Sequence, residues 1–296
     1  MRAAWRTACL VLALGAGTAL GAEPPAIVDA LGRQVALPRP PARLVTIFAS
    51  NTELVAAVGL ADRIVGIESF TRFPPEVLGR PVVGGRLGFS VDRVIRQRPD
   101  LVVVTPARQA VHQLVDPMER LGIPIAVITH RTIPEVTANI RLIAAAGGMP
   151  ERGEAVASGL EQRLAAVARR IEGRPRPRVA MITGRIASGL LLVARPGSYT
   201  ADAMVAAGGA LAFDRPQMLA QVAPEAVLRA DPDVVLFAGS VTDMHELFAR
   251  RGWASLRALA EKRVFAVSRA EFLIPGPRVV DGVEKLAALL HPDVGP

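Results

Sequence analysis

The feature that most constrains the fold is a segment that occurs twice in the chain. Residues 90–104 read SVDRVIRQRPDLVVV, and residues 223–237 read APEAVLRADPDVVLF. The copies align without a gap and share a Pro-Asp pair, Pro99-Asp100 in the first and Pro232-Asp233 in the second. Each copy predicts a short amphipathic helix, a turn at the Pro-Asp pair and a buried strand. A unit that recurs in both halves of the chain predicts two similar lobes with a cleft between them, where we expect the functional site.

The composition allows a sizeable core. The chain has 296 residues, of which 51% are hydrophobic and 21% charged, enough for one large or two medium domains. The formal net charge of +8 comes almost wholly from arginine, since Lys262 and Lys285 are the only lysines. Either a GC-rich genome or an anionic ligand explains this richness in arginine. The basic residues are scattered rather than clustered, so we expect no nucleic-acid partner.

The first 22 residues are predicted to be a signal peptide. Arg2 and Arg6 precede an apolar stretch at 8–20, which is too short to span a bilayer, and Ala22 offers a cleavage site. An N-terminal membrane anchor is the alternative. Cys9 is the only cysteine and lies inside this segment, so the mature chain has no thiol, disulfide or cysteine metal site. We therefore expect an exported protein.

Strands and helices alternate along the rest of the chain. In the first half, a Pro-rich hairpin at 23–43 precedes predicted strands at 44–50, 63–68 and 123–129 and helices near 51–59, 109–121 and 134–146. In the second half, strands are predicted at 178–184, 189–194 and 263–268, with helices after the SYTADAM segment at 198–204 and at 278–290. This β-α alternation predicts mostly parallel sheets.

The longest helical pattern lies between the two series. Residues 151–172 place five apolar residues on one face, namely Val156, Leu160, Leu164, Val167 and Ile171. Gly173 ends the pattern, and the sequence RPRPR at 174–178 breaks regular structure. We therefore predict an α/β protein with two Rossmann-like lobes, at 23–150 and 174–296, joined by a single long backbone helix at 151–173. A stiff helical connection predicts only small domain motion around a ligand.

Residues 48–77, FASNTELVAAVGLADRIVGIESFTRFPPEV, resemble the periplasmic substrate-binding proteins of iron-siderophore and vitamin B12 ABC importers. The resemblance lies in the Ser-Asn-Thr-Glu motif at 50–53, the segment from Gly59 to Ile67 and the FTRFPP loop at 70–75. The family motif "E.il.l.PDlVi" occurs at 92–104, with Asp92 in place of the usual Glu, and again at 225–237. The resemblance covers nearly the whole mature chain.

The resemblance implies a monomeric periplasmic protein that carries no cofactor and delivers its ligand to an ABC permease dimer with its ATPase. The implied ligand is a metal chelate, either a ferric siderophore or a cobalamin-type corrinoid; heme or a molybdate-type oxyanion is the alternative. One acidic residue on each lobe docks onto arginines of the permease, and Glu53 and Glu225 are the matching positions. Both open predicted helices and are expected to face solvent. We expect Glu53→Ala combined with Glu225→Ala to abolish transport and to spare ligand affinity.

Ligand contacts are expected from loops at the strand ends that face the cleft. The candidates are aromatic and arginine residues of both halves: Phe48, Phe70, Arg72, Phe73, Arg86, Arg108, Arg185, Tyr199, Phe272 and Arg278. Core packing is the alternative role for each phenylalanine, and a solvated surface position is the alternative for each arginine. A cleft of this kind suits a large, flat or rigid ligand that carries carboxylates or phenolates.

Direct binding of a bare metal ion is not expected. Histidines 112, 130, 245 and 291 show no HxH or HxxxH spacing. Tyr199, the only tyrosine, is either an iron ligand or a turn cap, whereas Phe70 and Phe73 stand where relatives carry Tyr or Trp and can stack but not ligate. The motifs GxSxG, HExxH and GxxxxGK[ST] do not occur, so a binding protein is expected and an exported enzyme is the alternative.

Overall fold

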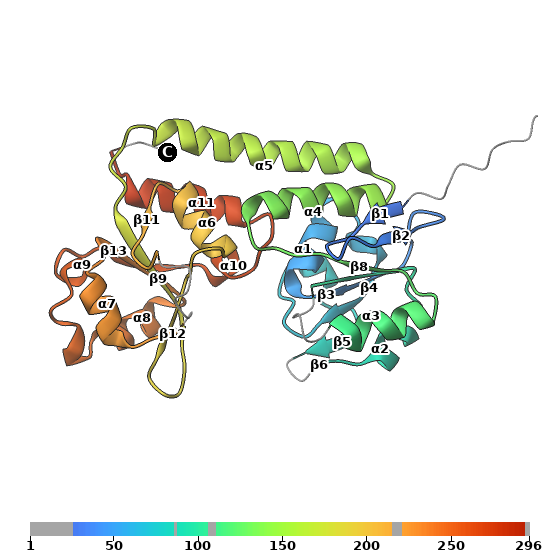
Figure 1. Ribbon diagram of the computed structural model, residues 1–296, viewed down its shortest axis with the longest axis horizontal. Coiled ribbons are helices and arrows are strands. Elements are labelled where there is room, and N and C mark those ends of the chain that lie inside the picture. Colours follow the sequence, from blue (N-terminus) through green and yellow to red (C-terminus); the bar gives the residue numbers. More distant parts are fainter. Residues whose placement is uncertain (1–25, 86–87, 106–110, 215–220, 294–296) are drawn as a thin grey trace, which may run out of the picture.

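A computed structural model describes residues 26–85, 88–105, 111–214 and 221–293. Two α/β lobes lie side by side beneath a long helix (Figure 1). The predicted signal peptide at 1–22 lies outside the described residues, as do Arg86 and Arg108. Within the described part of the chain, no helix is both long and apolar enough to cross a membrane.

The N-terminal lobe is built on a sheet with the strand order β6-β5-β4-β3-β7-β8, in which β6 alone runs antiparallel to its neighbour. Its strands are β3 (Leu44–Ile47), β4 (Ile64–Glu68), β5 (Val82–Gly85), β6 (Gly88–Phe89), β7 (Leu101–Val104) and β8 (Ile125–Val127). Its helices are α1 (Ala49–Ala57), α2 (Val91–Arg96), α3 (Val111–Arg120) and α4 (Ile133–Ala146). The predicted N-terminal hairpin is present as β1 (Ala26–Val28) and β2 (Gln34–Ala36).

The C-terminal lobe has the strand order β12-β10-β9-β13-β14, with the short β11 also paired to β9. Its strands are β9 (Arg178–Arg185), β10 (Leu191–Val193), β11 (Ala210–Leu211), β12 (Gln221–Val222), β13 (Val234–Ala238) and β14 (Val264–Val267). Its helices are α6 (Tyr199–Ala206), α7 (Pro224–Ala230), α8 (Val241–Phe248), α9 (Arg257–Ala260), α10 (Arg269–Phe272) and α11 (Val279–Leu290). Strands β9, β13 and β14 are parallel, whereas β10 runs antiparallel to β9 because the turn between them is too short for a crossover helix.

The repeated segment forms the same unit in both lobes. The first copy is α2 followed by β7, and the second is α7 followed by β13. In each lobe the repeat strand lies parallel to the first strand of the main sheet, β7 beside β3 and β13 beside β9. Val94 and Val227, at equivalent positions of the two helices, are both fully buried. The predicted fold, two α/β lobes of similar plan, is therefore confirmed.

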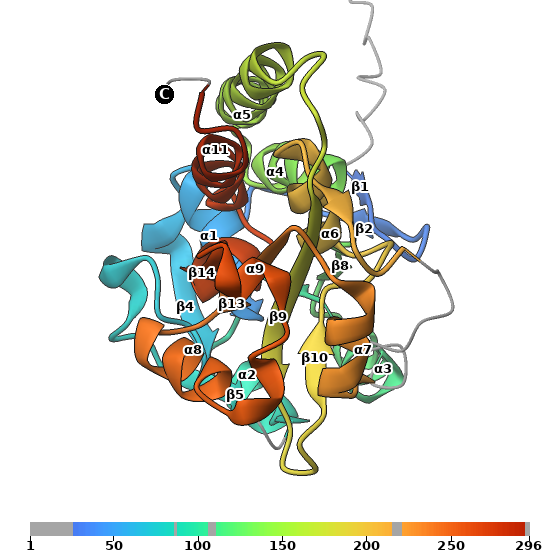
Figure 2. The same cartoon turned by 90° about the vertical axis from the view of Figure 1, so that its left-hand side faces the viewer.

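Helix α5 (Pro150–Arg170) runs along both lobes and packs on α4 at one end and on α11 at the other (Figures 1 and 2). Gly153 permits the close approach to α4, because a Cβ atom there would collide with the side chain of Ala144. A single hydrophobic cluster extends from Leu54 of the N-terminal lobe through Ala157 of α5 to Val283 of the C-terminal lobe. A shared core resists separation of the lobes, which is consistent with the predicted small domain motion.

Candidate functional site in the cleft between the lobes

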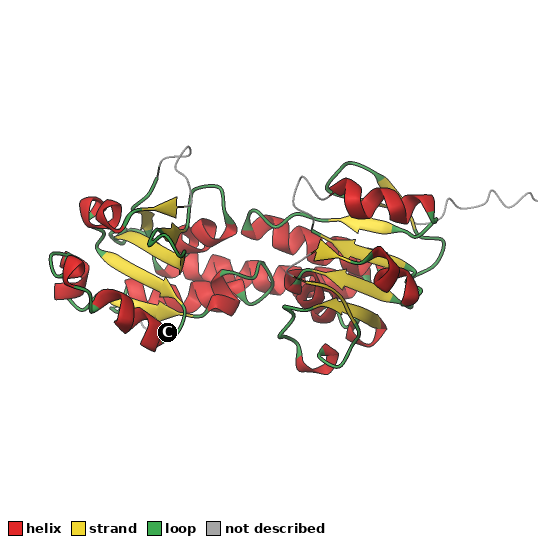
Figure 3. Ribbon diagram, turned by 90° about the horizontal axis from the view of Figure 1, so that it is seen from below, coloured by secondary structure: helices red, strands yellow, loops and turns green. Residues whose placement is uncertain are grey.

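The strands of both lobes run toward the gap between them (Figure 3). The loops that follow the parallel strands β3, β4, β9 and β13 therefore face the same gap. In α/β proteins the loops at the carboxyl ends of parallel strands are the usual place for a ligand.

The N-terminal wall of this region carries exposed phenylalanines. Phe48, Phe70 and Phe73 are 38%, 51% and 41% exposed, and they follow β3 and β4. Phe48 has a φ of 83°, in the left-handed region that costs energy for any residue with a Cβ atom. Its ring lies 6.2 Å from the ring of Phe89. Exposed aromatic rings on a strained backbone at a strand end are typical of a binding wall rather than of a core.

A buried carboxylate connects the two loops that carry these rings. Glu68 ends β4 with only 5% of its surface exposed, and its Oε1 accepts a hydrogen bond of 3.1 Å from the backbone N–H of Phe70. Burial raises the pKa of Glu68, and hydrogen bonds from the backbones of Phe70, Phe48 and Ala49 oppose that rise. Glu68 therefore positions the phenylalanine loops relative to each other. An acidic residue at the end of an otherwise apolar strand was the available sequence signal.

The C-terminal wall is polar. A cavity of ≈ 540 Å³ lies at the carboxyl ends of β9 and β13, and its polar and charged lining residues are Thr183, Arg185, Ser240, Asp243, Glu246 and Arg269. Arg269 donates hydrogen bonds of 3.0 and 3.1 Å to the carbonyl oxygens of Thr183 and Ala238, which holds the two strand ends together. The exposed guanidinium of Arg185 faces no described carboxylate within ion-pair distance. The site thus combines an aromatic wall with a polar, arginine-bearing wall.

An ion pair joins the lobes beside the aromatic wall. Glu53 of α1 is 3% exposed, and its carboxylate accepts hydrogen bonds of 2.9 and 2.5 Å from Nε and Nη2 of Arg278, which precedes α11. The guanidinium of Arg278 also lies 4.4 Å from the ring centroid of Phe73, a cation-π geometry. Burial raises the pKa of Glu53, and Arg278 opposes the rise.

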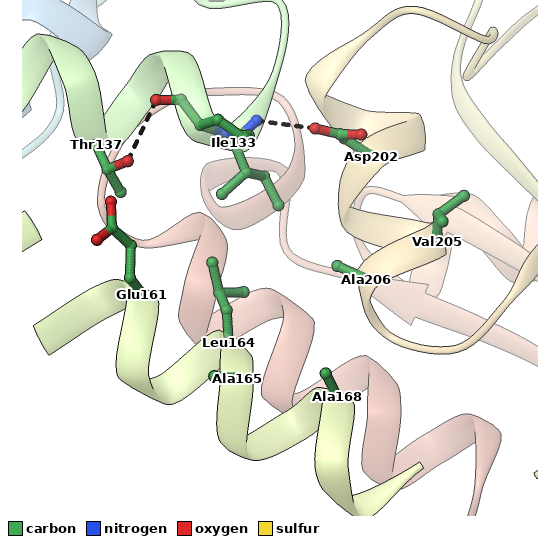
Figure 4. Close-up of a pocket in the computed structure, with 10 residues that line it drawn as sticks. Ile133, Thr137, Glu161, Leu164, Ala165, Ala168, Asp202, Val205 and Ala206 are labelled. Carbon is green, nitrogen blue, oxygen red and sulfur yellow. Dashed lines mark hydrogen bonds between the residues drawn. The ribbon is translucent and has the colours of Figure 1, made fainter. Parts of the chain in front are cut away.

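A second bond between the lobes lies on the opposite, helical side. There the backbone N–H of Ile133, at the start of α4, donates a hydrogen bond of 3.0 Å to Oδ2 of Asp202 in α6. Figure 4 shows this bond at the edge of a mainly apolar cavity of ≈ 430 Å³ between α4, α5 and α6. The lobes are therefore joined on both sides of their shared core.

The structure corrects three expectations. Glu53 does not face solvent, because the segment before α11 covers it with Gly276 and Arg278. Phe272 is not a cleft residue: it is 2% exposed and belongs to the hydrophobic core. Tyr199, expected at the cleft, is the first residue of α6, its hydroxyl is buried, and burial raises the pKa of its phenol, which favours the structural role over that of an iron ligand.

The remaining candidate ligand-binding residues differ in the contacts that their side chains make. Phe48, Phe70, Phe73 and Arg185 are exposed at the cleft-side strand ends as expected. Arg72 is exposed, but its guanidinium donates hydrogen bonds to the carbonyl oxygens of Ser69 and Thr71 in its own loop. Sequence reasoning did not find Glu68, Phe89 or Arg269. For Glu68 the signal was an acidic residue at the end of an apolar strand, whereas the contacts of Phe89 and Arg269 with distant segments leave no local pattern to detect.

Among the described residues, no group of three or more His, Cys, Asp or Glu side chains could hold a metal ion. His130 belongs instead to a buried network at the end of β8. Its Nε2 lies 2.8 Å from Oδ1 of Asn51, and its Nδ1 lies 3.1 Å from Nδ2 of Asn139. Burial lowers the pKa of His130 to about 4, so the ring is neutral and structural at neutral pH.

Proteins of known sequence and structure share this architecture. A curated vitamin B12-binding protein of Vibrio cholerae is 24% identical over 86% of this chain and 91% of its own length. An uncharacterised ABC transporter substrate-binding lipoprotein of Bacillus subtilis is 26% identical over 91% of this chain and 86% of its own. The crystal structure of the periplasmic vitamin B12-binding protein BtuF of Vibrio cholerae superposes with a TM-score of 0.77 at 23% identity, covering 87% of this chain and 99% of that one.

A heme-binding relative has the same fold. The periplasmic heme-binding protein RhuT from Roseiflexus superposes with a TM-score of 0.73 at 25% identity, over 85% of this chain and 98% of that one. Two α/β lobes joined by a backbone helix are the architecture of the class III substrate-binding proteins. Residues 44–270 match the periplasmic binding protein family, and the chain belongs to that family.

Proposed function

We propose that the protein captures a metal chelate in the cleft and delivers it to an ABC permease dimer with its ATPase. The observation that carries the proposal is the group of exposed rings at Phe48, Phe70 and Phe73, together with the polar cavity at the strand ends of the other lobe, which Arg185 lines. Aromatic faces suit a flat or rigid apolar surface, and a guanidinium suits a carboxylate or phenolate. A ferric siderophore or a cobalamin-type corrinoid presents both kinds of surface.

The aromatic wall also indicates which molecule supplies the ligand atoms of the metal. Phe70 and Phe73 can stack on a ligand but cannot ligate an ion, and the Tyr199 hydroxyl is buried. On this side of the cleft the chelator therefore supplies the bonds to the metal. Relatives named for vitamin B12 and for heme support a chelated metal as the ligand class.

Isothermal titration with a panel of probes tests the proposal. The panel consists of cyanocobalamin, a ferric hydroxamate siderophore, hemin and molybdate. Calorimetry is preferred to tryptophan fluorescence because Trp253 is buried against Phe248, with ring centroids 5.0 Å apart. Binding of a siderophore or corrinoid supports the proposal. Binding of molybdate alone, or of no probe, contradicts it.

Phe48→Ala combined with Phe70→Ala is expected to weaken binding of the chelate identified in that panel by about 100-fold. Each ring contributes roughly 1.5 kcal/mol of stacking and apolar contact. The measurement is the Kd of the purified variant by calorimetry. Leu121→Ala is the control, since Leu121 is also an exposed apolar side chain, 55% accessible, and lies outside the cleft. An equal loss of affinity in the control would count against the aromatic wall.

Glu68→Ala is expected to lower the free energy of unfolding by about 2 kcal/mol and to weaken chelate binding about tenfold, because backbone N–H groups lose their acceptor and the phenylalanine loops separate. Glu68→Gln keeps one carbonyl acceptor and should show smaller effects. Denaturant unfolding and the same titration measure the two quantities. A variant that loses stability but binds like the unsubstituted protein would show that Glu68 does not position the loops.

The structure changes which acidic residues we propose for docking onto the permease. Because Glu53 is buried, it cannot present a carboxylate to a permease, and the exposed acid at the start of the N-terminal copy of the repeat is Asp92. Asp92 of α2 and Glu225 of α7 are both exposed in the first turns of equivalent helices. Figure 1 places α2 and α7 at the lower ends of the two lobes, on the side away from α5. Our proposal therefore pairs Asp92 with Glu225 as the docking acids, and it includes export by the signal peptide at 1–22.

A further inference from the structure

The RPRPR sequence contributes to a cavity that the cleft does not include. The loop between α5 and β9 forms one side of a cavity of ≈ 370 Å³, and Arg263 and the end of α11 form the others. Pro177, Asp233 and Arg263 directly precede β9, β13 and β14. The cavity therefore lies at the amino ends of the parallel strands, on the opposite edge of the sheet from the ligand cleft.

Three guanidinium groups line this cavity, from Arg174, Arg176 and Arg263. Arg176 donates one hydrogen bond of 2.8 Å to the carbonyl oxygen of Val205, and within the described residues none of the three forms an ion pair with a carboxylate. Two acids also line the cavity, but Asp233 is engaged elsewhere: its oxygens accept hydrogen bonds of 2.7 Å from the backbone N–H of Arg178 and 2.8 Å from Arg257. Asp293 is the other acid, so the lining has three arginines against one carboxylate that is not already bonded elsewhere.

The frame that holds these arginines is rigid. Pro175, Pro177 and Pro292 restrict the backbone on two sides of the cavity. The ring of His291 is 7% exposed and packs against Gly208, where a Cβ atom would collide with Nε2. Burial lowers the pKa of His291, and the charges of Arg174 and Arg176 act in the same direction. The imidazole of His291 therefore lines the cavity as an uncharged ring, close enough to Arg174 and Arg176 to be affected by their charges.

We propose that this cavity binds a small phosphate-bearing anion, with pyrophosphate as the simplest example, independently of the cleft. Guanidinium groups form paired, charge-assisted hydrogen bonds with phosphate oxygens, and arginine is favoured wherever that planar match is used. A volume of ≈ 370 Å³ lies within the range of small-molecule sites and exceeds what a single water-sized ion needs. Because the guanidiniums come from two different loops, an anion between them neutralises charges that otherwise repel each other.

Calorimetric titration with sodium pyrophosphate, at low ionic strength and neutral pH, tests the site. The unsubstituted protein is expected to bind pyrophosphate with a Kd below about 1 mM and more tightly than sulfate, since a diphosphate reaches more than one guanidinium. Arg174→Ser combined with Arg263→Ser is expected to raise that Kd at least tenfold. Arg174 is exposed and Arg263 is half-buried, so circular dichroism and the melting temperature verify that the variant is folded.

Two controls locate the binding. Arg195→Ser combined with Arg250→Ser removes the same charge from exposed positions of the C-terminal lobe outside this cavity, and Arg185→Ser removes an arginine from the cleft. Unchanged pyrophosphate binding in both controls supports the proposal. No measurable binding by the unsubstituted protein, or an equal loss in either control, overturns it.

Discussion

Replacing Asp92 and Glu225 together with alanine is expected to abolish uptake by cells while leaving chelate binding by the purified protein unchanged. Both carboxylates are exposed, so their removal costs little stability. Against arginines that become desolvated in a complex with the permease, each charge-assisted contact contributes roughly 1.5–3 kcal/mol. Loss of both contacts weakens docking by at least about 100-fold, which is enough to stop transport at ordinary protein concentrations.

Uptake of labelled chelate in cells that express each variant measures this effect, alongside calorimetry on the purified proteins. Each single substitution should reduce uptake partially, because one lobe still docks. Glu151→Ala combined with Glu172→Ala is the matched control, as both are exposed acids at the two ends of the α5 segment, away from α2 and α7. Normal uptake by the Asp92 and Glu225 double variant would refute the docking assignment without affecting the proposed ligand.

Glu53→Ala is expected to behave quite differently and to destabilise the fold by about 3 kcal/mol. The substitution leaves Arg278 without its partner, at a side-chain exposure of only 25%, and unpaired charges at buried sites are costly. It also removes the ion pair that joins the lobes beside the aromatic wall and frees Arg278 to move off the ring of Phe73. We therefore expect lower stability together with a wider distribution of distances between the lobes.

Denaturant unfolding measures the first effect, and spin-label distances between the lobes measure the second. Adding Arg278→Ala to Glu53→Ala should recover part of the lost stability, because no unpaired charge then remains. Glu284→Ala is the control, since the ion pair between Arg163 and Glu284 joins α5 to α11 with side chains 40% and 35% exposed, and such pairs contribute under about 1 kcal/mol. If Glu53→Ala costs no more than Glu284→Ala, the interlobe ion pair has no special role.

Much of the fold could be predicted because its signals are local. The two copies of the repeat carry their own helix periodicity, turn residues and apolar strand, and each folds as the same unit beside the first strand of its lobe. The long helix was predicted at 151–173 and is observed as α5 at Pro150–Arg170. The antiparallel hairpin of β9 and β10 was not anticipated, because strand direction depends on the path of the connection rather than on the strand residues.

The candidate site was only partly predictable, because exposure depends on packing. Phe48 and Phe272 are the same residue type in similar contexts, yet one lies on a strained strand end at the cleft and the other lies in the core beneath α11. Local sequence contains no information on which neighbouring element covers a side chain. Aromatic residues could therefore be proposed as a set, while their division into wall and core could not.

The acidic residues show the same limit most clearly. Local sequence patterns were enough to predict two lobes, a connecting helix, the family and a short list of acids at helix starts. Only the tertiary structure decided that Glu53 is buried and that Asp92 and Glu225 are the exposed pair. The reason is physical: the partner that buries Glu53 is Arg278, which lies 225 residues away in the chain and reaches it only when the two lobes pack on their shared helix.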